Sequence, residues 1–144
     1  MIRHILAPTD GTPLSADAMR RAVDLAKLAQ ARLTFVTCNT PFEAYAADPL
    51  VLAHRDEYET AIESCARDFL EAGRKMAREA HVDADGEHVI AQHPWQGILD
   101  CAQSRGCDLI VMASHGRHGV AGLLLGSQTQ KVLTHSKLPV LVCR

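Results

Sequence analysis

The sequence predicts an open α/β fold, in which helices cover both faces of a parallel five-stranded sheet in one domain of 144 residues. Two observations predict it. Strand-like apolar runs alternate along the chain with segments of helical spacing, in the order β-α-β-α-β-α-β-α-β. The run DLIVMA at residues 108–113 is apolar almost throughout, as expected for a strand that a parallel sheet buries on both faces. The alternation predicts four helices and right-handed crossovers.

The first strand and helix carry clear boundary signals. Residues 2–7 (IRHILA) form a short apolar run that Pro8 ends. Thr12 and Pro13 then supply an N-cap and a first helical residue. Small and apolar residues recur every three or four positions as far as Gln30, so we expect one buried helical stripe there.

The middle of the chain contributes two further strands and a long helix. Residues 32–38 (RLTFVTC) are rich in β-branched and aromatic side chains, which favours a strand. The spacing in residues 46–80 is helical, with an interruption near Asp48 and Pro49, and predicts a long helix after an irregular loop. Turn residues at 83–86 precede a strand at residues 87–92.

The last third begins with a helix that Pro94 opens at residues 95–104. A strand at residues 108–113 leads into a stretch with four glycines, Gly116, Gly119, Gly122 and Gly126. Ser127 and Gln130 fit an S-x-x-Q capping box, which predicts a helix over residues 127–135. The final strand is Val140–Cys143.

Composition narrows the function classes. Hydrophobic residues make up 47% and charged residues 22% of the chain, and the net charge is -2, so we expect neither a nucleic-acid nor a membrane partner. The first ten residues lack a signal-peptide pattern. Five scattered cysteines without a C-x-x-C pair favour a reducing compartment, and we expect a cytoplasmic protein. The histidines lack the spacing of a metal site, so we expect no metal ligands.

The glycine stretch and the loop at residues 8–11 predict a binding crevice. In open parallel sheets, ligands bind beyond the carboxyl ends of the strands, where the strand order reverses. Glycines let backbone amides approach an anion, and the positive end of the following helix points to the same place. No Walker motif and no G-x-G-x-x-G pattern is present. From the residues alone, a phosphate site and a purely structural role in turns and packing are equally consistent with these glycines.

Several motifs together resemble the universal stress protein family. The segment MASHG, followed by nine residues and then Gly126 and Ser127, is similar to the ATP-binding signature of that family, G-x-x-G-x9-G-[ST]. ILAPTDG near the start, HPWQGI, DLIVM and HSKLPVLV match other parts of the family pattern, so the resemblance spans the chain. It implies a sheet order 3-2-1-4-5 in a Rossmann-like, adenine-nucleotide α-hydrolase-like fold.

The resemblance also implies which residues meet an adenine nucleotide. Asp10 corresponds to the carboxylate that meets the adenosine, with Pro8 and Thr9 shaping that wall, while Thr37 stands where the family usually has an apolar residue against adenine. The residues expected along the ribose and phosphates are Met112, Ala113 and Gly116, and those expected to donate to the triphosphate are Gly126, Ser127 and Gln128.

Four positions in and around the predicted crevice have alternative interpretations. His115 and Arg117 border the glycine stretch and can contact phosphate, or they can be solvated loop residues. Asp10 by itself suits a turn or helix cap. Ala113 replaces the first glycine of the signature. Alanine is disfavoured there if the backbone is left-handed, but it adds only a methyl group if the backbone is extended, which we expect because Ala113 ends a strand; strained backbone is expected at Gly116 and Gly126 instead.

The sequence therefore predicts a universal stress protein that binds ATP, with or without Mg²⁺, and regulates unknown protein partners in the stress response as a homodimer paired through Val140–Cys143. No nucleophile or general base stands out, so we expect no catalytic residues and at most slow ATP hydrolysis. The alternatives are a nucleotide-independent dimeric interaction module and, less well supported, an α-hydrolase-type enzyme.

Overall fold

The protein contains five parallel strands in the order β3-β2-β1-β4-β5, as expected from the sequence. A computed structural model describes residues 1–45, 47–116 and 125–144. The strands are β1 His4–Pro8, β2 Arg32–Asn39, β3 Ala84–Ile90, β4 Leu109–Ala113 and β5 Val140–Cys143. All neighbouring strands pair in parallel, so their carboxyl ends lie at one edge of the sheet.

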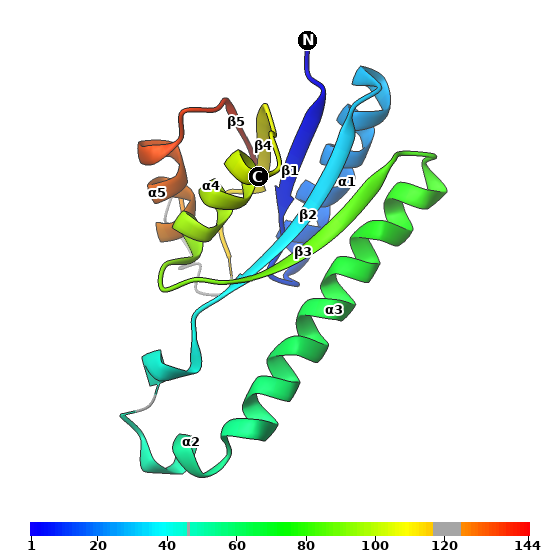
Figure 1. Cartoon of the computed structure of the whole chain (residues 1–144). Helices are drawn as coiled ribbons and strands as arrows, with labels where there is room; N and C mark the ends of the chain where they lie inside the picture. Colours follow the sequence, from blue (N-terminus) through cyan, green and yellow to red (C-terminus); the bar gives the residue numbers. More distant parts are fainter. Residues whose placement is uncertain (46, 117–124) are drawn as a thin grey trace.

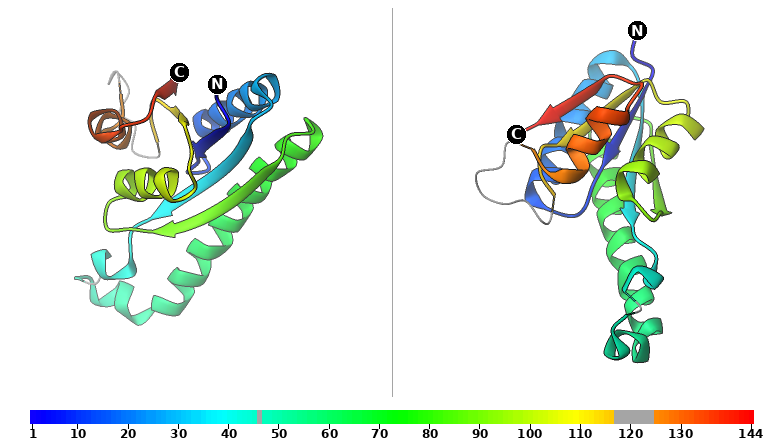
Figure 2. Two further views of the ribbon diagram at one scale, coloured as in Figure 1. Left: turned by 45° about the horizontal axis from the view of Figure 1, so that its top comes forward. Right: turned by 90° about the vertical axis from the view of Figure 1, so that its left-hand side faces the viewer.

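Four long helices cover the two faces of the sheet (Figure 1). The helices α1 Pro13–Ala29 and α3 Arg55–Glu79 pack on one face, and α4 Pro94–Ser104 and α5 Ser127–His135 pack on the other. A 3₁₀ turn η1 Phe42–Tyr45 and a short helix α2 Pro49–Ala53 connect β2 to α3. Figure 2 shows that α3 runs well past the carboxyl ends of the strands, with α2 near its tip. None of the described helices is long and apolar enough to span a membrane.

The boundary signals of α1 are confirmed. The Oγ1 atom of Thr12 accepts a hydrogen bond from the N–H of Ser15 at 3.2 Å, and Pro13 occupies the first helical position. The helix ends where Gln30 adopts a left-handed conformation with φ 55°. Local sequence was enough here because both caps are contacts within one turn.

Two predicted segments differ in part from the structure. β3 begins at Ala84, inside the predicted turn at 83–86, because the strand pairs with β2 from Leu33↔Ala84 onward. Gly86 is a strand residue, and a Cβ built on it would lie 3.2 Å from the Cβ of Leu70 on α3, so the glycine serves close packing. The predicted helix within 46–80 is divided at His54, and only its second part, α3, covers the sheet.

Two apolar cores lie on either side of the sheet. The first joins β1, β2 and β4 to α1 and α3 and includes Phe35, which is fully buried. A Cβ built on Gly73 of α3 would lie 2.8 Å from the Phe35 ring, so this glycine lets α3 approach β2. The second core includes Ile98 of α4 and Val132 of α5.

The strands separate at the carboxyl edge between β1 and β4. Pairing of these two strands ends at Leu6↔Ile110, whereas β4 stays paired with β5 as far as Ala113↔Cys143. The chain leaves β1 toward α1 on one face, and α5 lies on the opposite face. This is the reversal of strand order at which open α/β folds bind ligands.

Candidate functional site

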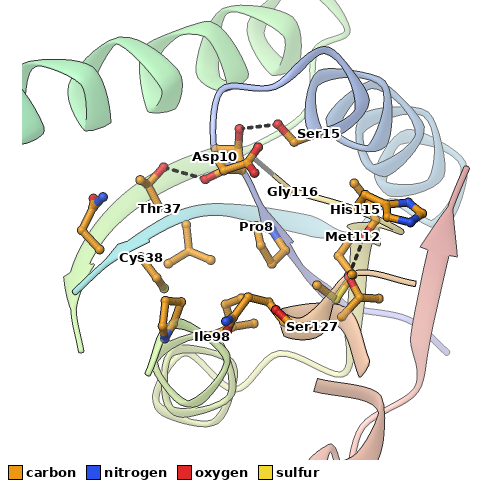
Figure 3. Close-up of a pocket in the computed structure, with 18 of the residues that line it drawn as sticks. Pro8, Asp10, Ser15, Thr37, Cys38, Ile98, Met112, His115, Gly116 and Ser127 are labelled. Atoms are coloured by element: carbon orange, nitrogen blue, oxygen red, sulfur yellow. Dashed lines mark hydrogen bonds between the residues drawn. The ribbon is translucent and has the colours of Figure 1, made fainter. Parts of the chain in front are cut away.

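A pocket of about 360 Å³ lies at this reversal point (Figure 3). It is lined by residues that follow β1 and β4, by the end of β2 and by the first turns of α4 and α5. The structure brings together all the predicted site residues that it describes, namely Pro8, Thr9, Asp10, Thr37, Met112, Ala113, His115, Gly116, Gly126, Ser127 and Gln128. Arg117 lies outside the described residues.

Asp10 uses its two carboxylate oxygens differently. Oδ1 accepts hydrogen bonds from the N–H and the Oγ1 hydroxyl of Thr12 at 3.1 and 2.6 Å, which holds the loop against the start of α1. Oδ2 lies beside Gly116, where a built Cβ would come within 2.7 Å of it. The turn-and-cap interpretation is therefore correct for Oδ1, while Asp10 as a whole lines the pocket.

A network of hydroxyl groups forms one wall next to Asp10. The Thr37 hydroxyl donates to the carbonyl of Thr9 at 3.1 Å, and the Thr9 and Ser15 hydroxyls are 3.2 Å apart. All three residues are buried. Gly11 follows with φ 80° and lies under the ring of Phe69 from α3, so no larger residue fits this turn. The wall is rigid because each hydroxyl has a protein partner.

Gly116 and Gly126 are explained by close approach rather than by left-handed backbone, and Gly119 and Gly122 lie outside the described residues. Ala113 belongs to β4 and has no positive φ, as expected for the extended case. Gly116 and Gly126 have no positive φ either, which corrects the expectation that strain falls on them. A Cβ on Gly126 would lie 3.2 Å from the Cα of His115, so crowding of two backbones explains this glycine.

Helix α5 starts where expected, but not by the expected cap. Gly126 is the N-cap residue, Ser127 is already helical, and no side chain caps the helix, so the S-x-x-Q capping box does not form. The N–H of Gly126 donates to the carbonyl of Ser114 at 2.7 Å, and this differs from the free donor expected at that position. The N–H groups of Ser127 and Gln128 have no acceptor within the helix, because they belong to its first turn.

Gln128 connects the pocket to α4. Its Oε1 atom accepts a hydrogen bond from the N–H of Trp95 at 3.0 Å. Trp95 is half-buried, and its ring stacks on that of His135 with 4.6 Å between centroids. The side chain of Gln128 therefore holds α4 and α5 together.

Eight further lining residues were not predicted. They are Ser15, Val36, Cys38, Asn39, Thr40, Pro94, Ile98 and Thr129. Pro94 and Ile98 belong to the HPWQGI segment, so this match was a usable signal. Residues 38–40 lie at the carboxyl end of β2, and the strand-end rule could have found them.

Among the described residues, the titratable side chains that line the pocket are Asp10, Cys38 and His115. Burial raises the pKa of the Cys38 thiol to about 12, so this cysteine stays protonated. The Nδ1 atom of His115 is 3.0 Å from the hydroxyl of Ser114. Among the described residues, no group of three or more His, Cys, Asp or Glu side chains could hold a metal ion.

Fold and pocket together define a Rossmann-like α/β protein with a ligand pocket at the reversal of its sheet. The sequence agrees with that class: the model of the Universal stress protein family matches residues 1–144, and the chain belongs to this family. Universal stress protein YxiE of Bacillus subtilis is 30% identical over 153 residues, and the match covers 100% of this chain and 100% of YxiE.

Solved structures have the same fold. MJ0577 of Methanocaldococcus jannaschii matches with a TM-score of 0.83 and 24% identity, covering 99% of this chain and 96% of that chain. A universal stress protein in complex with cAMP has a TM-score of 0.71 at 24% identity, covering 99% and 97%. The protein from Archaeoglobus fulgidus in complex with dAMP has a TM-score of 0.68 at 14% identity, covering 100% and 98%.

Proposed function

We propose that this protein binds ATP in the pocket and acts as a dimeric regulator in the stress response. One observation carries the proposal: the Asp10 loop and the glycine stretch, more than 100 residues apart in sequence, line one pocket together with the N-terminus of α5. Its volume of about 360 Å³ is in the range of small-molecule sites. The structural neighbours solved with cAMP and dAMP support an adenine nucleotide as the ligand.

The two ends of the pocket suit the two ends of a nucleotide. Apolar side chains, including Val36 and Ile98, supply walls for a planar base. At the other end, the first-turn N–H groups of Ser127 and Gln128 are donors for phosphate oxygens. Ala113 adds a methyl group but no backbone strain, so it is compatible with the nucleotide.

A homodimer through β5 is supported by the difference between the two edges of the sheet. The β5 edge consists of VLVC, carries no charge and has Leu141 45% exposed. The β3 edge carries Asp85 and Glu87, which are both paired with Arg105. Charged side chains discourage strand addition at an edge, whereas an exposed apolar edge favours it.

The proposed role is regulation by nucleotide occupancy, with at most slow hydrolysis, in the cytoplasm. All five cysteines are free thiols, which suits a reducing compartment. Mg²⁺ can accompany ATP, and the Oδ2 oxygen of Asp10 is the carboxylate oxygen beside the glycine stretch.

The test is calorimetric titration of the purified, nucleotide-stripped protein with ATP, adenosine and GTP, preceded by native mass spectrometry to identify any co-purified ligand. The variant Gly116→Val introduces a side chain against Asp10. The control Gly106→Asn changes an exposed glycine that has φ +65° and open space around it, and asparagine tolerates this backbone.

ATP bound at one per chain by the wild type and by Gly106→Asn, but lost in Gly116→Val, supports the proposal. Absence of binding to the wild type at millimolar ATP and Mg²⁺ rejects it and leaves the nucleotide-independent dimeric module. GTP binding as tight as ATP binding rejects adenine as the recognised base.

A further inference from the structure

We infer that Thr129 is the positioning residue for the phosphate end of the pocket: its hydroxyl fixes the first turn of α5 to the end of β4 and thereby orients the N–H groups of Ser127 and Gln128. The inference rests on the proposed function and deepens it. Thr129 lies two residues beyond the motif that resembles the family signature.

The end of β4 is paired on one side and is held on the other by a side-chain hydrogen bond. Pairing with β1 stops at Leu6↔Ile110, so from there to Ala113 the strand has a paired neighbour only on its β5 side. The Ala113 carbonyl accepts a hydrogen bond from the Thr129 hydroxyl at 2.9 Å, and Thr129 is only 3% exposed. An apolar side chain at position 129 would take this donor away from a buried carbonyl, which the fold tolerates poorly.

The same hydrogen bond excludes a direct donor role for the side chain. A threonine hydroxyl carries one hydrogen, and that of Thr129 is committed to Ala113. The residue lines the pocket, yet it can act on an anion only through the backbone that it holds. Thr129 should therefore affect nucleotide binding by setting the position of the N-terminus of α5.

Two further bonds hold the same turn, and they show what Thr129 adds. The N–H of Gly126 donates to Ser114 O, which fixes the residue before the helix. The Gln128 side chain accepts from Trp95, which fixes the turn to α4. Within the described parts of the chain, Thr129 is the residue whose side chain ties the helical turn itself to β4, so a single substitution can release it without altering the backbone.

The position of Thr129 predicts a loss that is confined to phosphate binding. The apolar walls at Val36 and Ile98 come from β2 and α4 and do not depend on the Thr129 hydroxyl. Adenosine binding should not depend on the Thr129 hydroxyl. ATP binding should depend on it, because the N–H groups of Ser127 and Gln128 must point toward the phosphate oxygens. The difference between ATP and adenosine affinity therefore separates positioning from a general effect on folding.

The experiment measures ATP and adenosine affinities by titration calorimetry for the wild type, Thr129→Val, Thr129→Ser and Thr134→Val. Thr134→Val is the matched control, because the Thr134 hydroxyl donates to Gln130 O on the exposed side of the same helix. Thermal unfolding is recorded for each protein. If Thr129→Val does not fold, Thr129→Ala takes its place, since the smaller side chain lets water reach the carbonyl.

Thr129→Val should weaken ATP binding about tenfold, which is about 1.4 kcal/mol, and change adenosine binding by less than about twofold. Thr129→Ser should restore ATP affinity, and Thr134→Val should leave both ligands unaffected. Equal losses for ATP and adenosine, or no loss of ATP affinity, overturn the inference while the proposed function stands. A wild type that binds neither ligand rejects the proposed function, and the inference with it.

Discussion

The Oδ2 atom of Asp10 and the backbone of Gly116 lie against each other across the pocket, so that a Cβ on Gly116 would be 2.7 Å from the carboxylate. The other oxygen of Asp10 accepts two hydrogen bonds from Thr12. One side chain therefore joins the loop after β1, the start of α1 and the glycine stretch. This arrangement makes both the nucleotide site and its neighbouring helix sensitive to Asp10.

Asp10→Asn should keep the fold but weaken binding of ATP and adenosine alike, by about tenfold. Asparagine still accepts from Thr12, but it replaces the carboxylate oxygen beside Gly116 with a donor or a neutral oxygen. Titration calorimetry measures both affinities. Asp17→Asn, which removes an exposed charge from α1, is the control. Unchanged adenosine affinity in Asp10→Asn would contradict the assignment of Asp10 to the adenosine part.

Gly73→Ala should destabilise the protein by about 1–2 kcal/mol. The new Cβ would lie 2.8 Å from the ring of Phe35, which is fully buried and cannot move aside, and such overpacking outweighs the gain in helix propensity. Urea unfolding measures the change. Ala72→Gly, at an exposed position on the same helix, measures the difference in helix propensity between alanine and glycine, which should lower the free energy of unfolding by about 1 kcal/mol. A more stable Gly73→Ala protein would show that α3 can shift.

Acidification should destabilise the fold through His88. Burial lowers the pKa of this imidazole, although Glu63 opposes the shift, and Nε2 is 2.9 Å from Oδ1 of Asn39. The unfolded chain therefore binds the proton more readily, so stability is full above a pH of about 6.5 and falls below it. Unfolding at pH 7.5 and 5.5 should show a larger loss in the wild type than in His88→Gln.

The control for this pH dependence is His81→Asn. His81 is exposed and has φ 59°, a conformation that asparagine adopts easily. This variant should keep the wild-type loss on acidification. If His88→Gln loses as much stability as the wild type, His88 is not the group responsible.

One thiol per chain should react rapidly with Ellman's reagent at pH 8. Cys65 is the exposed cysteine, whereas burial raises the pKa of Cys38 and Cys101 to about 12 and that of Cys107 to about 11. The thiolate is the reactive form, so the cysteines with a raised pKa react slowly until the protein unfolds. Cys65→Ser should remove the fast phase and Cys107→Ser should not. A second fast thiol in the native protein would contradict this burial pattern.

Leu141→Lys should convert a dimer into a monomer at micromolar concentration. Lysine places a charge on the apolar β5 edge, where pairing with a second copy would have to desolvate it. Ile90→Lys on the β3 edge, where the native residue is 54% exposed, is the matched control. Sedimentation velocity measures the association state. A dimer that survives Leu141→Lys but not Ile90→Lys would move the interface to β3.

The sequence by itself determined the features that depend on neighbours along the chain. The Thr12 cap, the Pro13 start and the Gln30 end of α1 are contacts within a turn, and the strand order of the family followed from short motifs. The pocket-lining residues at the ends of β1, β2 and β4 were foreseeable because parallel strands bring their carboxyl ends to one edge, whatever the details of packing. Neither the helix ends nor the common edge of the strands requires knowledge of contacts between residues far apart in sequence.

Only the tertiary structure decided the features that depend on partners far away in sequence. β3 begins early because β2 offers it a ladder of hydrogen bonds, although its first residues look like a turn. The N–H of Gly126 donates to the carbonyl of Ser114, so this expected ligand donor holds the fold instead. The side-chain oxygen of Gln128 accepts from the N–H of Trp95, a contact that no local pattern predicted. A donor's ligand role depends on which acceptor the folded chain brings within 3 Å, and no local pattern encodes that distance.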